Sequence, residues 1–215
     1  MYAEEHARPV AMMAKKHYSV RETYWLSHDA ALTVRHFAKL RARSPLVSER
    51  VMLAVTEVNG CALCAYGHTR FALDAGLSDD EIRELLGGEA GSVPDAELRA
   101  VAFAQHYADR RGRPEHVVWS SLVDAYGEEQ ALGVLGTARM IMFGNAIGIP
   151  WSSLLSRLHG APHPDSSLRY EIGTIAGSAL LTPVAVVHGR ISAFRGMLRR
   201  TRLVESANPH IGRVT

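Results

Sequence analysis

Almost the whole chain shows the residue spacing of α-helices, and this periodicity restricts the fold more than any other feature. Between residues 21 and 43, for example, apolar side chains recur at intervals that place them on one face of a helix. The sequence contains no convincing alternating strand pattern and no clear internal repeat. We therefore predict an all-α fold, in which a bundle of helices encloses one core.

Start and stop signals divide the chain into separate helices. Ser44 and Pro45 supply a cap and a first-turn proline, and Asn59-Gly60 ends the next helix because both residues tolerate a positive φ. Ser78 to Glu81 forms a capping box. The predicted helices are 21–43, 46–58, 61–75, 78–86, 94–110, 115–125, 128–147, 151–159 and 166–204. Gly148-Ile149-Pro150 is expected to stop the helix 128–147, and Pro183 to bend the last helix.

A change in composition near residue 160 suggests a boundary. Proline, glycine and serine cluster in GAPHPDS, at 160–166. We predict a helical domain over 1–160 and a C-terminal helical extension over 161–215. The extension is expected to pack on the domain or at a subunit interface.

Charge and hydropathy exclude several classes of function. The formal charge is only +2, and no dense basic stripe with interleaved aromatics occurs, so no nucleic-acid partner is expected. The arginines of 195–202 are interpreted as a solvated helix end. The N-terminal residues lack the apolar run of a signal peptide, and the apolar stretch 174–187 is shorter than the ~20 residues of a membrane span. We expect a cytoplasmic protein without a membrane partner.

The only two cysteines, Cys61 and Cys64, lie three residues apart and are followed by His68. In a helix the three side chains share a sector of about 60°. This spacing allows a redox-active dithiol, three ligands of a metal site, or two inert core cysteines. A thioredoxin fold is disfavoured because the motif follows a helix instead of a strand.

A fourth residue, Glu49, lies twelve positions before Cys61. Together with the Asn-Gly turn, the pattern Glu49, Cys61, Cys64, His68 resembles the alkylhydroperoxidase D-like proteins of the carboxymuconolactone decarboxylase superfamily. The resemblance extends over about residues 20–160. The stretch ERVMLAVTEVNGCALCAYGH carries it most specifically, and the later helices show more divergence. Leu63 departs from one branch of the family, which has a histidine between the cysteines. The C-terminal 50 or so residues have no counterpart.

The resemblance implies an alkylhydroperoxidase-like fold and the reduction of hydroperoxides through the dithiol. On the family pattern Cys64 attacks the peroxide, Cys61 resolves the sulfenic acid, and Glu49 with His68 relays protons. Proximity to the helix N-terminus favours Cys61 instead as the more acidic thiol. Glu57, eight residues after Glu49, is a rival acid for the site, whereas Tyr66 is interpreted as a packing residue.

The resemblance also implies a homo-oligomer with no tightly bound cofactor and no metal. It implies a lipoyl group, dihydrolipoamide, as external reductant, and a lipoylated protein or a peroxiredoxin as partner. Two alternatives stay open: a lactone decarboxylase-type enzyme of the same superfamily, and a non-enzymatic redox-sensing or metal-binding module.

Overall fold

The computed structural model describes residues 16–207, with side chains as far as Met197. Two sequence-based expectations therefore lie largely outside the described residues. One concerns the N-terminal segment, which lacks the apolar run of a signal peptide, and the other concerns the side chains of the basic cluster beyond Met197. Every regular element of the described part is helical, and it contains no strand, which confirms the all-α fold. The helices are α3 (Val20–Arg43), α4 (Pro45–Asn59), α5 (Ala62–Ala75), α6 (Asp79–Leu86), α7 (Asp95–Asp109), α8 (His116–Leu158) and α9 (Leu168–Ala207).

Helix α4 is the centre of the core. Five consecutive residues from Val51 to Val55 are buried, so the helix is enclosed on all sides instead of presenting one apolar face. It packs against α7, α8 and α5. Any polar side chain on α4 therefore lies inside the protein and needs a partner there.

Helix α8 continues where the sequence predicted a stop. The expected end at Gly148-Ile149-Pro150 is wrong, because Pro150 lies inside a helix that continues to Leu158. Proline removes one backbone hydrogen bond, but Ile149, Pro150 and Ser153 are all buried against the core, and this packing holds the helix together. The predicted break between 125 and 128 is confirmed as a kink at Gly127, where φ is 75°.

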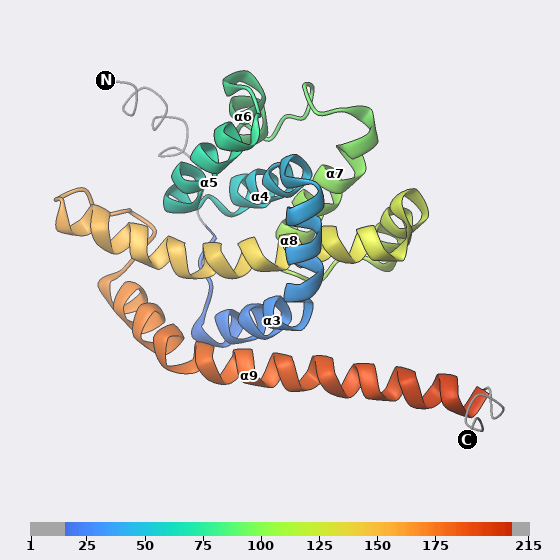
Figure 1. Cartoon of the computed structure of the whole chain (residues 1–215). Helices are drawn as coiled ribbons and strands as arrows, with labels where there is room; N and C mark the ends of the chain where they lie inside the picture. Colours follow the sequence, from blue (N-terminus) through green and yellow to red (C-terminus); the bar gives the residue numbers. More distant parts are fainter. Residues whose placement is uncertain (1–15, 208–215) are drawn as a thin grey trace.

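Helix α3 lies between α8 and α9 (Figure 1). Two glycines of α8 allow the approach from one side, since a Cβ on Gly133 would lie 2.9 Å from the Leu40 side chain and one on Gly136 would lie 2.9 Å from the backbone of Phe37. Helix α9 covers the other side of α3. It contains Pro183 and bends along its length in Figure 1.

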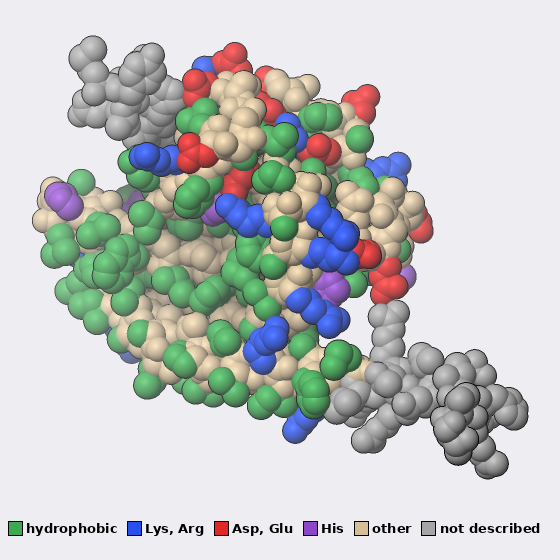
Figure 2. Space-filling model, viewed as in Figure 1, with side chains coloured by type: hydrophobic (Ala, Val, Ile, Leu, Met, Phe, Trp, Pro, Cys, Tyr) green, Lys and Arg blue, Asp and Glu red, His purple; other side chains and the backbone are tan. Residues whose placement is uncertain are grey.

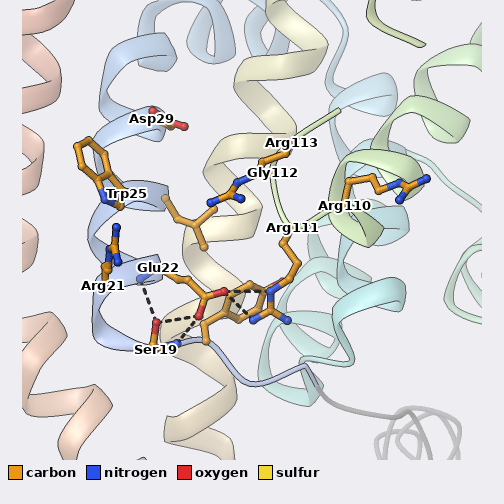
Figure 3. A pocket seen from close by; sticks show the side chains of 11 residues that line it. Ser19, Arg21, Glu22, Trp25, Asp29, Arg110, Arg111, Gly112 and Arg113 are labelled. Carbon is orange, nitrogen blue, oxygen red and sulfur yellow. Dashed lines mark hydrogen bonds and ion pairs between the residues drawn. The ribbon is translucent and has the colours of Figure 1, made fainter. Parts of the chain in front are cut away.

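The start of α3 is fixed to the loop after α7. Ser19 and Glu22 form a capping box, and Arg111 donates to the Glu22 carboxylate at 2.8 Å (Figure 3). Burial alone would raise the pKa of Glu22, but the hydrogen bonds from Ser19 and Arg111 outweigh it and lower that pKa. These residues line a cleft of about 640 Å³ between the start of α3 and this loop.

By length and composition, two of the described helices are apolar enough to cross a membrane. In α8 the apolar window is mostly buried in the protein, at 61%, as expected for a core helix. In α9, over Leu168–Met197, only 22% of the window is buried. The apolar part of α9 is thus longer and far more exposed than the stretch 174–187 suggested.

Candidate functional site

Glu49 is the buried acid of the site. It lies in the first half of α4 with 1% of its side chain exposed. One carboxylate oxygen, Oε1, accepts a hydrogen bond from Arg41 Nη1 at 2.6 Å, and the other, Oε2, lies 2.8 Å from His68 Nδ1. The arginine compensates the charge of a carboxylate that the core would otherwise exclude.

The turn between α4 and α5 positions the first cysteine. Gly60 has the left-handed conformation (φ 69°) that ends α4, as its sequence predicts. The preceding Asn59 is fully buried and accepts a hydrogen bond from Tyr18 Oη at 2.7 Å. This buried contact fixes the direction in which the chain enters α5.

Cys61 caps α5. The sequence places it in the first turn of the helix, whereas the structure places it one residue earlier, as the N-cap. Its sulfur accepts a hydrogen bond from the backbone N–H of Cys64 at 3.3 Å. A donor of this kind at a helix N-terminus stabilises a thiolate.

Cys61 and Cys64 form a disulfide, with their Cα atoms 5.3 Å apart. Cys61 is fully buried, while Cys64 is partly exposed. Helix α8 closes the site from behind: a Cβ on Gly148 would lie 2.7 Å from Cys61 Sγ and 2.8 Å from Cys64 Sγ. Only glycine at this position leaves room for both sulfurs.

His68 follows Cys64 by one turn of α5 and joins the dithiol helix to Glu49. A carboxylate can only accept, so the ring donates from Nδ1, which leaves Nε2 as its free acceptor. The ring also meets the edge of Phe71 at 5.8 Å between centroids, and Arg41 lies 5.9 Å from the centre of the same phenyl ring. Phe71 and Glu49 together hold the imidazole in one orientation.

The outer surface of α5 beside the site is apolar. Leu63, Tyr66 and Phe71 are all exposed, Tyr66 to 64%. The interpretation of Tyr66 as a packing residue is therefore wrong for this chain, because its side chain faces solvent.

Glu57, the rival acid, lies elsewhere. Its carboxylate faces the backbone of Gly88, with Oε1 3.4 Å from the position of a Cβ there. Burial raises the pKa of Glu57, and the charge of Lys16 partly opposes this. The carboxylate that contacts His68 is that of Glu49, and an approach of Glu57 to the site stays a prediction.

The structure thus brings together the four residues that the sequence singled out and adds two that it missed. Arg41 was missed because nothing in the sequence distinguishes it from its neighbour Arg43. Gly148 was missed because it was interpreted as part of a stop signal. Within residues 16–207, no group of three or more His, Cys, Asp or Glu side chains is arranged to hold a metal ion.

Residues 34–106 match the sequence model of the carboxymuconolactone decarboxylase family. This part of the chain is similar to that family. The region contains Arg41, Glu49, Cys61, Cys64 and His68, whereas Gly148 and all of α9 lie outside it. It is narrower than the 20–160 over which the sequence resembles alkylhydroperoxidase D-like proteins. Comparison of the whole chain with curated proteins gave no match, and comparison with solved structures gave none either.

Proposed function

We propose that the protein is a dithiol peroxidase, an oxidoreductase that reduces hydroperoxides through Cys61 and Cys64. The observation that carries this proposal is the unequal exposure of the two linked sulfurs beside a hydrogen-bonded chain of His68, the buried Glu49 and Arg41. Such a site offers one sulfur to a substrate and keeps the second within reach.

In the first step the reduced Cys64 acts as the nucleophile, because it alone of the two is accessible. Its thiolate attacks the terminal oxygen of the hydroperoxide and breaks the O–O bond. Cys64 becomes a sulfenic acid, and the alkoxide leaves and takes a proton to become the alcohol.

In the second step the Cys61 thiolate attacks the Cys64 sulfur. The S–S bond forms, the S–O bond breaks, and the hydroxyl leaves as water after taking a proton. Two thiols and one hydroperoxide are thus converted into a disulfide, an alcohol and water. Cys61 needs no access to solvent for this step.

The disulfide must then be reduced to two thiols, and in this step Cys64 is attacked and Cys61 leaves. An external dithiol, for which we propose a lipoyl group in its dihydro form, attacks the exposed Cys64 sulfur, forms a mixed disulfide with it and displaces Cys61 as a thiolate. The Cys61 thiolate is stabilised by the Cys64 N–H at the N-terminal end of α5, and a more stable thiolate leaves faster. The second thiol of the lipoyl group then attacks the lipoyl sulfur of the mixed disulfide, which closes the lipoyl disulfide and releases Cys64 as a thiolate. The exposure of Cys64 therefore serves the attack on the peroxide, and the stabilised thiolate of Cys61 serves the reduction of the disulfide.

His68 is the proposed proton carrier. With Nδ1–H held by Glu49, Nε2 is the basic nitrogen that takes the thiol proton and returns it to the alkoxide. Glu49 orients the ring and stabilises its protonated form, and Arg41 orients Glu49. The histidine touches the reacting groups, whereas Glu49 and Arg41 act through it.

Peroxide consumption with dihydrolipoamide as reductant tests the proposal. We expect turnover by the wild type and none by Cys64→Ser or Cys61→Ser. A sulfenic acid trap should label Cys61→Ser, in which Cys64 is still present, and should not label Cys64→Ser. Unchanged turnover in both serine variants would refute the proposal.

Two glutamates of the same helix provide a matched pair. Glu49→Gln should lower turnover by about a hundredfold, since it disorders the base. Glu57→Gln should leave turnover unchanged, because Glu57 faces Gly88. Equal effects of the two substitutions would exclude the proposed relay.

The similarity of residues 34–106 to the carboxymuconolactone decarboxylase family supports a second candidate, a lactone decarboxylase-type reaction. That reaction does not require a dithiol. Ring-substrate turnover that survives in the Cys61→Ser, Cys64→Ser double variant would favour it over the peroxidase.

A further inference from the structure

Helix α9 has two faces of different character, and its packing on α3 fixes which one is exposed. The packed face carries small side chains, among them Ser178, Ala185 and Gly189, all buried. A Cβ on Gly189 would lie 2.4 Å from the carbonyl oxygen of His28, so the two backbones are in close contact. This close contact between α9 and α3, here called the seam, prevents α9 from rotating about its own axis.

The opposite side, here called the apolar face of α9, is uncovered in the described chain. Its large side chains recur every three or four residues from Leu180 onward, with Ile172 two turns earlier, and all are exposed: Ile172, Leu180, Val184, Val187, Ile191 and Phe194. The face extends for about 33 Å along the helix. Figure 2 shows hydrophobic side chains gathered along this edge of the molecule. A continuous patch of this size marks an interaction surface.

Over most of its length α9 has charged residues of one sign only. Between Ile172 and Val204 the sequence has no aspartate or glutamate, but it has five arginines, at 190, 195, 199, 200 and 202. The last acidic residue before this stretch, Glu171, is fully buried and bound by Arg157 at 2.8 Å. No carboxylate of the stretch itself neutralises these arginines.

The adjoining part of α3 adds an exposed aromatic ring and another cation. Trp25, 47% exposed, lies 6.0 Å from His188 of α9 between ring centroids. Figure 3 shows Trp25 and Arg21 on the side of α3 away from Arg111. Tryptophan with arginine beside an apolar helix face is typical of proteins that lie at a membrane–water interface.

We propose that the apolar face of α9, with Trp25 and Arg21, docks on an anionic lipid bilayer. The apolar side chains enter the boundary of the acyl chains, and Arg190 and Arg195 meet the lipid phosphates and carboxylates. A second copy of the chain fits less well, because its own segment from Ile172 to Val204 has no carboxylate with which the arginines could pair. Spanning would require α9 to leave the seam with α3.

This orientation leaves the dithiol free. Helices α3 and α8 lie between α9 and α5 in Figure 1, so docking through α9 places Cys64 away from the lipid. Docking would localise the protein at the bilayer surface. The inference does not depend on the reaction that the dithiol performs.

Sedimentation of the full chain with lipid vesicles tests the inference. We expect binding to vesicles of phosphatidylcholine with about 30% phosphatidylserine, and little binding to phosphatidylcholine alone. Val187→Asp should weaken binding by about tenfold or more, since it puts a charge in the middle of the face. Arg190→Gln should weaken it roughly fivefold.

The matched controls lie on other helices. Val117→Asp changes a valine of similar exposure, 68% against 58% for Val187, and Arg83→Gln removes an exposed arginine of α6. Neither should alter vesicle binding. Because all four positions are exposed, far-ultraviolet circular dichroism should show the same helical content in every variant.

Three results would overturn the inference. The first is absence of binding to anionic vesicles, and the second is equal binding to neutral ones. The third is a dimer in lipid-free solution, by light scattering, that Val187→Asp converts to a monomer and Val117→Asp does not. That result would assign the apolar face to a second copy of the chain.

Discussion

Glu49 Oε2 lies 2.8 Å from His68 Nδ1, and this contact joins the centre of the core to the helix that carries the cysteines. The acid lies on α4, the helix buried on all sides, and the histidine on α5, which is exposed along one face. The buried Glu49 thus sets the position of the more exposed His68. The same relationship makes the residues behind Glu49 relevant to activity.

Arg41→Gln is expected to lower dithiol peroxidase turnover by roughly tenfold or more, because Glu49 loses the cation that orients it. The pH at which turnover reaches half its maximum should shift as well, which a purely structural role would not produce. Arg43→Gln is the control: Arg43 bonds to Glu129 on the surface, and its loss should leave both quantities unchanged.

Gly148→Ala is expected to lower the free energy of unfolding by about 1–3 kcal/mol, because its methyl group would overlap both sulfurs. It should also slow oxidation of the dithiol by peroxide. Gly144→Ala, on the same helix, has only an ordinary contact at 3.7 Å with Ile141 and should be neutral or stabilising. Thermal unfolding and thiol titration measure these effects. Equal stability of the two variants would contradict the close approach.

Arg50→Met is expected to lower the free energy of unfolding by about 3–5 kcal/mol. Arg50 is buried and donates to Glu81 at 2.5 Å and to Glu97 at 2.7 Å, so its loss leaves two carboxylates without their cation. Arg83→Met, which removes an exposed pair with Asp80, should change stability by less than about 0.5 kcal/mol. Chemical denaturation of the three proteins measures the difference.

Glu57→Gln is expected to stabilise the protein at neutral pH and to have less effect in acid. Burial raises the pKa of Glu57, so the folded state favours the protonated form. Its contribution is complete below the ordinary pKa of 4.5 and is lost as the pH rises through the raised folded value. A glutamine keeps no charge at any pH.

Urea denaturation at about pH 4 and about pH 8 measures this dependence. The gain from Glu57→Gln should be larger at the higher pH, and Glu89→Gln, at an exposed position, should show no such trend. A gain of the same size at both pH values would show that the buried charge is not its cause.

The sequence was sufficient to predict most of the helices and the neighbourhood of the four site residues, since both depend on local spacing. Asn59-Gly60 ends α4 and the next residue caps α5, so the order along the chain already places Glu49, Cys61, Cys64 and His68 near one another. Their catalytic roles, the division at residue 160, the oligomer and the cytoplasmic location stay predictions.

What the sequence could not reveal depends on contacts between distant segments. Pro150 stops an isolated helix, but the core on both sides of it holds α8 together. The need for glycine at position 148 follows from the packing of α8 against the two sulfurs. The role of Arg41 follows from the packing of α3 against α4, which brings it to Glu49. The exposure of α9 likewise could not be inferred from hydropathy, because a buried helix and an uncovered one have similar composition.

The sulfur of Cys61 is at once half of a disulfide and the cap of a helix. A thiolate accepts the Cys64 N–H more strongly than a disulfide sulfur does, because it carries a full negative charge. Opening the bond therefore tightens the first turn of α5, and closing it loosens that turn. The rate at which the amide proton of Cys64 exchanges with deuterium therefore depends on the oxidation state of the dithiol. Measuring this rate reports that state without any added dye.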